Sequence, residues 1–202
     1  PAGAAIPVGP VAETVAAAQR CVDAGYTRVK LKVVPGTAYF SAQAVRKAFP
    51  DLVVSLDANQ SFTEHDIEEL RNLDELDIAW IEEPLDPRRP VASGPHDLFA
   101  RLAQLQRRIK TPVCLDESIV SARDLARVLK HPELKCFALK IGKFGGIEPA
   151  LQFVHMAQAR GMRVWMGGMY DTGVSRRMHA AFETLSGVSD AGDIGATSRY
   201  FD

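Results

Sequence analysis

A repeated unit dominates this chain: a short apolar strand, a polar or glycine-containing loop, and then an amphipathic helix. Eight strand candidates occur, at residues 5–8, 28–33, 52–57, 78–82, 113–116, 137–141, 163–166 and, most weakly, 188–194. Apolar residues at helical spacing predict helices between them, at residues 11–24, 64–76, 98–109, 121–129 and 150–160. Strands that alternate with helices predict a parallel sheet. About eight such units predict an α/β fold of the TIM-barrel type, a (β/α)7β barrel one helix short of eight full pairs.

Alternation within the strands predicts the face on which each side chain lies. In the segment 28–33 one face carries three large apolar residues, and the other carries Arg28, Lys30 and Lys32. We expect the apolar face to pack outward under the helices and the polar face to line the barrel interior. The polar inward residues are expected at or near the C-terminal ends of their strands. Active sites of such barrels are built at that end.

Charged residues recur at these strand ends: Lys32, Asp57, Glu82, Asp116 and Lys140. Each is 24 to 34 positions from the next, which is the length of one strand–helix unit. Lys30 lies two residues before Lys32. Three converging carboxylates repel one another unless a cation lies between them. Hard divalent ions prefer oxygen ligands, so we predict a Mg²⁺ site, with Mn²⁺ as the alternative, held by Asp57, Glu82 and Asp116. Lysines on both flanks suit proton transfer beside an enolate.

Two of the metal-ligand candidates each have a second carboxylate beside them in the sequence. Glu83 follows Glu82 and Glu117 follows Asp116, and adjacent strand residues point to opposite faces. We therefore expect one member of each pair to face the barrel, with parity favouring Glu82. Taken singly, each such pair is more typical of a loop or a helix start than of a metal site.

Composition excludes several classes of protein. Lys plus Arg number 24 against 25 for Asp plus Glu, so no basic excess suggests a nucleic-acid partner. No apolar run approaches the roughly 18 residues of a membrane span, and no leader pattern is visible. The three cysteines are odd in number and lie in apolar surroundings, which favours reduced thiols in a cytoplasmic protein.

Several motifs follow one another along nearly the whole chain: Val29-Lys30-Leu31-Lys32, Leu56-Asp57-Ala58-Asn59, Trp80-Ile81-Glu82-Glu83-Pro84-Leu85, residues 112–119, Leu139-Lys140-Ile141-Gly142, Gly167-Gly168-Met169, Gly192-Asp193-Ile194 and residues 198–201. In these motifs the chain resembles the enolase superfamily, and within it the muconate-lactonizing subgroup. Within that subgroup it is most similar to the branch of o-succinylbenzoate synthases and N-succinylamino acid (N-acylamino acid) racemases. Lysines on the second and sixth strands, without histidine at the seventh, disfavour the mandelate-racemase subgroup.

The resemblance implies roles for individual residues. Asp57, Glu82 and Asp116 would bind the metal, Lys32 and Lys140 would be catalytic, and the supporting or substrate-binding residues would be Lys30, Asn59, Gly168 and Met169. It also implies an enolase C-terminal-like barrel spanning residues 1–202, with the family's N-terminal capping domain absent from this chain. The partner would be a small-molecule carboxylate, with no nucleic acid or membrane, and the sequence leaves a homo-oligomer open.

The implied reaction is the Mg²⁺-dependent dehydration of 2-succinyl-6-hydroxy-2,4-cyclohexadiene-1-carboxylate to o-succinylbenzoate, in menaquinone biosynthesis. One alternative is an N-succinylamino acid racemase, or another acid-sugar or dipeptide-type epimerase of the superfamily. An alternative of a different class is a non-catalytic barrel fragment without its capping domain. Racemase-competent members carry Arg where this chain has Lys143, which favours the synthase. The usual Glu-Thr-Gly after the seventh strand is Asp171-Thr172-Gly173 here.

Overall fold

The computed structural model describes residues 2–90, 92, 94–169 and 171–195. Strands and helices alternate along these residues: β1 (Gly3–Ile6), α1 (Val11–Asp23), β2 (Arg28–Lys32), α2 (Ala38–Ala48), β3 (Val53–Asp57), α3 (Ile67–Asn72), β4 (Ile81–Glu82), α4 (Leu98–Gln106), β5 (Val113–Leu115), α5 (Ala122–Val128), β6 (Cys136–Leu139), α6 (Ile147–Ala159), β7 (Arg163–Met166) and α7 (Gly173–Phe182). Short 3₁₀ turns flank α3 at Glu64–Asp66 and Leu73–Glu75. Residues 198–201 of the sequence motifs lie outside the described residues.

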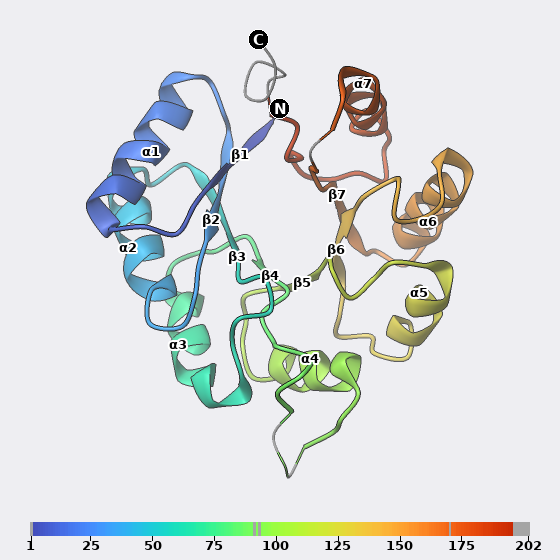
Figure 1. Cartoon of the computed structure of the whole chain (residues 1–202), viewed down its shortest axis with the longest axis horizontal. Helices are drawn as coiled ribbons and strands as arrows, with labels where there is room; N and C mark the ends of the chain where they lie inside the picture. The colour runs from blue at the N-terminus through green and yellow to red at the C-terminus, as the bar shows by residue number, and fades with distance from the viewer. Residues whose placement is uncertain (1, 91, 93, 170, 196–202) are drawn as a thin grey trace.

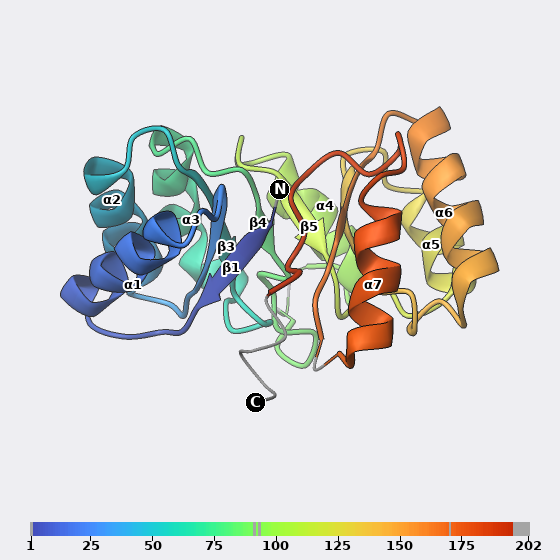
Figure 2. The same cartoon turned by 90° about the horizontal axis from the view of Figure 1, so that it is seen from above.

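The strands form one curled parallel sheet in the order β1-β2-β3-β4-β5-β6-β7, with the helices outside it (Figure 1). Figure 2 shows α1, α2 and α3 on one side of the strands and α5, α6 and α7 on the other. This is the predicted α/β barrel architecture. Within the described part of the chain, no helix is both long and apolar enough to cross a membrane.

The predicted eighth strand is reduced to a short closing segment. Residues 188–194 contribute two isolated parallel bridges, Trp165 with Asp190 and Ala2 with Gly192. The amide of Gly3 donates to the carbonyl of Gly192 at 2.8 Å, and the amide of Asp193 donates to the carbonyl of Met166 at 2.9 Å. The segment therefore bonds to β7 on one side and to the start of β1 on the other, and it closes the barrel.

The first strand and two of the helices also differ from the sequence prediction. The first strand ends at Ile6 rather than at residue 8, because Pro7 has no amide hydrogen to continue the ladder. Helices α2 and α7 were not predicted by residue range. The buried side of α2 holds mostly small residues, and α7 buries Arg176 and His179 beside Phe182, so neither has a strong apolar stripe.

Two apolar clusters hold the fold. The larger lies between the strands and the helices and includes Val29 and Leu31 of β2, as alternation predicts. The smaller lies inside the barrel and contains Trp80, Cys114, Cys136, Ala138 and Trp165. The rings of Trp80 and Trp165 stack with their centroids 5.2 Å apart. Because this cluster fills the lower interior, only the upper end of the barrel is left for polar chemistry.

Candidate active site

Strand register places most of the predicted site residues at one level of the barrel. Lys32 is paired with Asp57 across β2 and β3, and Asp57 is paired with Glu82 across β3 and β4. Asp116 directly follows β5, and Lys140 directly follows β6. Parallel strands end at the same edge, so these residues meet at the C-terminal mouth of the barrel.

On the β2 side of the mouth, lysines contact two of the predicted metal ligands. The Nζ atom of Lys32 lies 2.6 Å from Oδ2 of Asp57 and 2.5 Å from Oδ1 of Asn59. The Nζ atom of Lys30 lies 3.0 Å from Oε2 of Glu82 and 3.3 Å from Oδ2 of Asp57. The two lysines and two carboxylates thus form one charge cluster, with Asn59 at its edge.

On the opposite side of the mouth, two lysines contact the third predicted ligand. Lys140 donates a hydrogen bond to Oδ2 of Asp116, and the Nζ atom of Lys143 lies 2.9 Å from Oδ1 of the same carboxylate. Strands β2 and β6 lie on opposite sides of the barrel (Figure 1). Lys32 and Lys140 therefore approach the mouth from opposite directions. Lys143 is turned into the site and is not a solvated loop lysine, since only 21% of its side chain is exposed.

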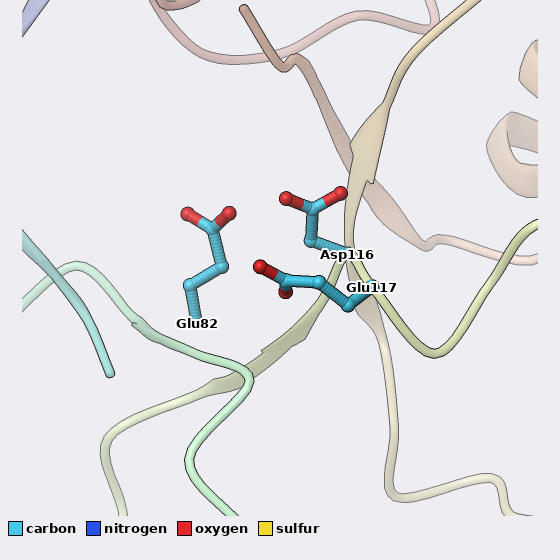
Figure 3. A group of neighbouring side chains, drawn as sticks. All are labelled: Glu82, Asp116 and Glu117. Atoms are coloured by element: carbon cyan, nitrogen blue, oxygen red, sulfur yellow. The ribbon is translucent and has the colours of Figure 1, made fainter. Parts of the chain in front are cut away.

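A group of carboxylates in the mouth has the spacing of a metal site. Among the described residues, Glu82, Asp116 and Glu117 each offer an oxygen, and these oxygens lie within 4.8 Å of one another. Figure 3 shows the side chain of Glu117 extending toward Glu82, with Asp116 beside them. Asp57, predicted as a ligand, is not in this group; it lies on the β2 side, against Lys32 and Lys30.

Two oxygens of this group have no hydrogen-bond partner among the described residues. They are Oε1 of Glu82 and Oε2 of Glu117, and both are buried. An unpartnered buried carboxylate oxygen is costly, and oxygen ligands of this kind are those that Mg²⁺ prefers. The donor set therefore fits a hard divalent cation.

The expectation that only one of Asp116 and Glu117 faces the barrel is wrong. Strand β5 ends at Leu115, so both residues lie beyond the region in which side chains alternate. Both can then bring a carboxylate to the same place.

Glu83, by contrast, turns away from the metal-capable group and fixes the loop after β5. It has a left-handed backbone, with φ of 40°. Its Oε1 accepts hydrogen bonds at 2.8 Å from the amides of Asp116 and Ser118, and it also accepts one from the Ser118 hydroxyl. Glu83 thus holds the backbone that presents Asp116, and parity was right to favour Glu82 as the inward residue.

Burial and charge act in opposite directions on the ionisable groups. Burial, with Asp57 and Asp116 nearby, raises the pKa of Glu82 well above its usual value despite Lys30. Burial also opposes the charge on Asp116, but its contacts with Glu82, Lys140 and Lys143 outweigh it and lower the pKa of Asp116 to about 2. Burial likewise opposes the charge on Lys30, yet Glu82, Asp193 and Asp57 keep its pKa well above the usual value. Closely spaced carboxylates with one raised and one lowered pKa are typical of functional sites.

A cavity of about 420 Å³ opens beside the lysines. Its lining includes Lys30, Lys32, Gly168, Met169 and Asp193. Gly168 is required there, since a side chain on it would lie 2.3 Å from the carbonyl oxygen of Asp193. The volume suits a small molecule, so the predicted supporting residues Gly168 and Met169 are next to the lysines.

The sequence indicated no site role for two further charged residues of this region, although alternation placed Arg28 on the inward face of its strand. Arg28 points into the barrel from the start of β2 rather than from its end, and Asp193 ion-pairs with both Arg28 and Lys30. Asp193 stands after the eighth strand position, so the series of strand-end carboxylates could have been extended to it. The inward face of Arg28 followed from alternation, but its partners come from other strands and from the closing segment, which no local pattern indicates.

Comparison with known proteins agrees with this geometry. The model of the "Enolase C-terminal domain-like" family matches residues 13–195. The chain belongs to that family. Within it, the chain is similar to members of the o-succinylbenzoate synthase and N-succinylamino acid racemase branch of the enolase superfamily.

Three relatives illustrate this. The chain is 34% identical over 192 residues to an N-succinylamino acid racemase of Thermus thermophilus, covering 95% of this chain and 50% of that protein. It is 39% identical over 183 residues to an o-succinylbenzoate synthase of Enterococcus faecalis, covering 91% of this chain and 47% of that protein. A crystal structure from E. faecalis, described as an "unknown member of enolase superfamily", has a TM-score of 0.89 at 36% identity and covers 100% of this chain and 52% of that one. The chain spans about half the length of these relatives.

Proposed function

We propose that the protein is an o-succinylbenzoate synthase, which eliminates water from 2-succinyl-6-hydroxy-2,4-cyclohexadiene-1-carboxylate. The observation that carries this proposal is the position of Lys32 and Lys140, each in contact with a carboxylate on opposite sides of one polar mouth. Relatives at 33–39% identity bear that synthase name, which supports the reaction class. Lys143, in place of the Arg expected of racemases, favours the synthase within the branch.

The lysines divide the proton transfer between them. Nζ of Lys32 accepts the proton from the ring carbon that bears the carboxylate, and an enediolate results. The bond from the ring to the hydroxyl oxygen then breaks, and Lys32 returns the proton to the leaving hydroxide, so that water departs and the ring becomes aromatic. Lys140 stays charged and stabilises the developing negative charge from the other side.

The carboxylates hold the cation that this chemistry needs. Glu82 and Asp116, together with Asp57 from the β2 side, would hold Mg²⁺, and the carboxylate of Glu117 lies close to those of Glu82 and Asp116. Mg²⁺ held there would supply positive charge that stabilises an enediolate. The cavity beside Lys30 and Lys32 would take the rest of the substrate.

Racemisation of N-succinylamino acids is the second candidate function. The opposed lysines would suit two bases on the two faces of one α-carbon, and a relative 34% identical is named for that activity. We would assay the full-length protein with both substrates in Mg²⁺. Formation of the aromatic product supports the synthase. NMR detects exchange of solvent deuterium into an N-succinylamino acid. If such exchange occurs without any dehydration, the racemase is the function and the synthase proposal is wrong.

A further inference from the structure

Asp193 joins the floor of the barrel to the charged mouth. Its Oδ1 lies 2.5 Å from Nη2 of Arg28, and its Oδ2 lies 2.6 Å from Nζ of Lys30. Only 11% of its side chain is exposed. One carboxylate therefore satisfies two buried cations, and it does so from the segment that closes the barrel.

Arg28 is itself fixed on every side, which makes it a firm anchor for Asp193. It donates to the hydroxyl of Ser55 at 2.9 Å and to the carbonyl of Ala191 at 2.7 Å. Its guanidinium lies 5.1 Å from the ring centroid of Trp80 and 4.9 Å from that of Trp165. Cation–π contacts of this kind, away from water, strongly favour a single position of the guanidinium.

Lys30 has three carboxylate neighbours, and they are not equivalent. Asp57 and Glu82 are two of the proposed metal ligands, whereas Asp193 is not proposed as a ligand and lies outside the metal-capable group found among the described residues. If Lys30 were held by Asp57 and Glu82 alone, it would compete with a cation for both of them. Asp193 gives Lys30 a partner that is not needed for the metal.

We propose that Asp193, anchored by Arg28, is a positioning residue that holds Lys30 at the side of the site, so that Asp57 and Glu82 remain available to a divalent cation. The inference rests on the metal site of the proposed function. It assigns Asp193 no contact with the metal or with the reacting atoms. Its effect on the cation passes through Lys30.

The test measures Mn²⁺ affinity of the full-length protein by electron paramagnetic resonance of the free ion. We expect Asp193→Asn to weaken Mn²⁺ binding about tenfold, the usual scale for a residue that supports metal ligands. In a Lys30→Met background the same substitution should change the affinity by less than about twofold, since the competitor is gone. Asp193→Ser, smaller than aspartate, provides a second uncharged variant should the first not fold, and circular dichroism checks both.

Asp190→Asn is the matched control. Asp190 lies in the same closing segment, but it pairs with Arg163 at the start of β7, and its Oδ2 is 2.6 Å from Nε of that arginine. Its loss should leave Mn²⁺ affinity at the wild-type value, whatever it costs in thermal stability. Three results would each overturn the inference. The first is equal Mn²⁺ affinity in the wild type and both folded Asp193 variants, and the second is an equal loss of affinity with and without Lys30. The third is a wild type that binds no Mn²⁺. Wild-type protein that binds Mn²⁺ without dehydrating the substrate would overturn the proposed function alone.

Discussion

The two ends of the barrel use charged residues in opposite ways. At the closed end, Arg46 donates to the backbone carbonyls of Leu76, Pro50, Leu52 and Asp77 over 2.7–3.0 Å. Asp74 there accepts from the amides of Lys110 and Thr111 and from the hydroxyl of Thr111. At the mouth, the charged groups are satisfied mainly by other side chains, such as Lys32 by Asp57 and Lys143 by Asp116.

This difference separates stability from function. A backbone carbonyl or amide cannot move to another partner without unfolding its loop, so we expect Arg46 and Asp74 to serve the fold. Side-chain partners can rotate and exchange a lysine for a ligand, and the mouth also keeps two carboxylate oxygens unpartnered within the described residues. Substitutions at the mouth should therefore remove activity and leave the fold, whereas substitutions at the closed end should do the reverse.

Asp57→Asn should give the largest effect on activity. The variant keeps the shape of the side chain but loses the charge that a divalent cation needs, so we expect Mg²⁺-dependent turnover of the full-length protein to be abolished. Steady-state assays over a range of Mg²⁺ concentrations measure this. Asp51→Asn, an exposed position just before β3, is the control and should keep normal turnover. An active Asp57→Asn enzyme that needs no metal would contradict the proposed site.

Lys32→Ala should have the second-largest effect on activity. A general base contributes about 10²- to 10⁴-fold to a rate, so kcat for dehydration should fall by about that factor. The KM should change much less if Lys32 acts mainly on the proton. Lys47→Ala, an exposed lysine of α2, is the matched control. Near-normal dehydration by Lys32→Ala would remove it from the mechanism.

Asp74→Ala tests the closed end. Its loss leaves the amide and hydroxyl of buried Thr111 without their partner, and we expect about 2–3 kcal/mol less stability. Urea unfolding monitored by circular dichroism measures this free energy. The kcat of the folded variant should stay at the wild-type value. A large fall in kcat with unchanged stability would reverse the proposed division between the two ends.

The sequence predicted the mouth better than it predicted the charges beneath it. Lys32, Asp57 and Glu82 stand at regular strand ends, and parallel pairing necessarily brings such positions to one level. Alternation placed Arg28 on the inward face, but it could not predict the partners of its guanidinium. Its burial depends on two tryptophans, a serine and a carboxylate that come from four distant parts of the chain.

The same limit explains the errors at element ends. Alternation fails where a strand stops, and the sequence has no sharp signal that β5 ends at Leu115, so only one of Asp116 and Glu117 was expected to face the barrel. Helix α7 was missed because its buried side includes Arg176 and His179. Local patterns thus predict strands and their order, while the pairing of buried charges is decided by tertiary contacts.

Lys143→Arg should have the smallest effect, and it bears most directly on the reaction. Lys143 shares the Asp116 carboxylate with Lys140, so its charge acts on the lysine proposed to work from the β6 side. Lysine is a flexible point charge, whereas arginine is a rigid fork that keeps its charge at any ordinary pH. Dehydration needs proton transfer at Lys32 alone and should stay within about twofold, while racemisation needs both lysines and should gain about fivefold, near 1 kcal/mol.

Both rates can be measured on the same preparations, by absorbance for dehydration and by NMR of deuterium exchange for racemisation. Lys130→Arg, at an exposed position in the turn that leads from α5 back to the closed end of the barrel, controls for the added guanidinium. A gain confined to racemisation means that Lys143 tunes Lys140 through their common carboxylate. If the ratio of the two rates is the same before and after the substitution, the contact of Lys143 with Asp116 neutralises charge and does not select the reaction.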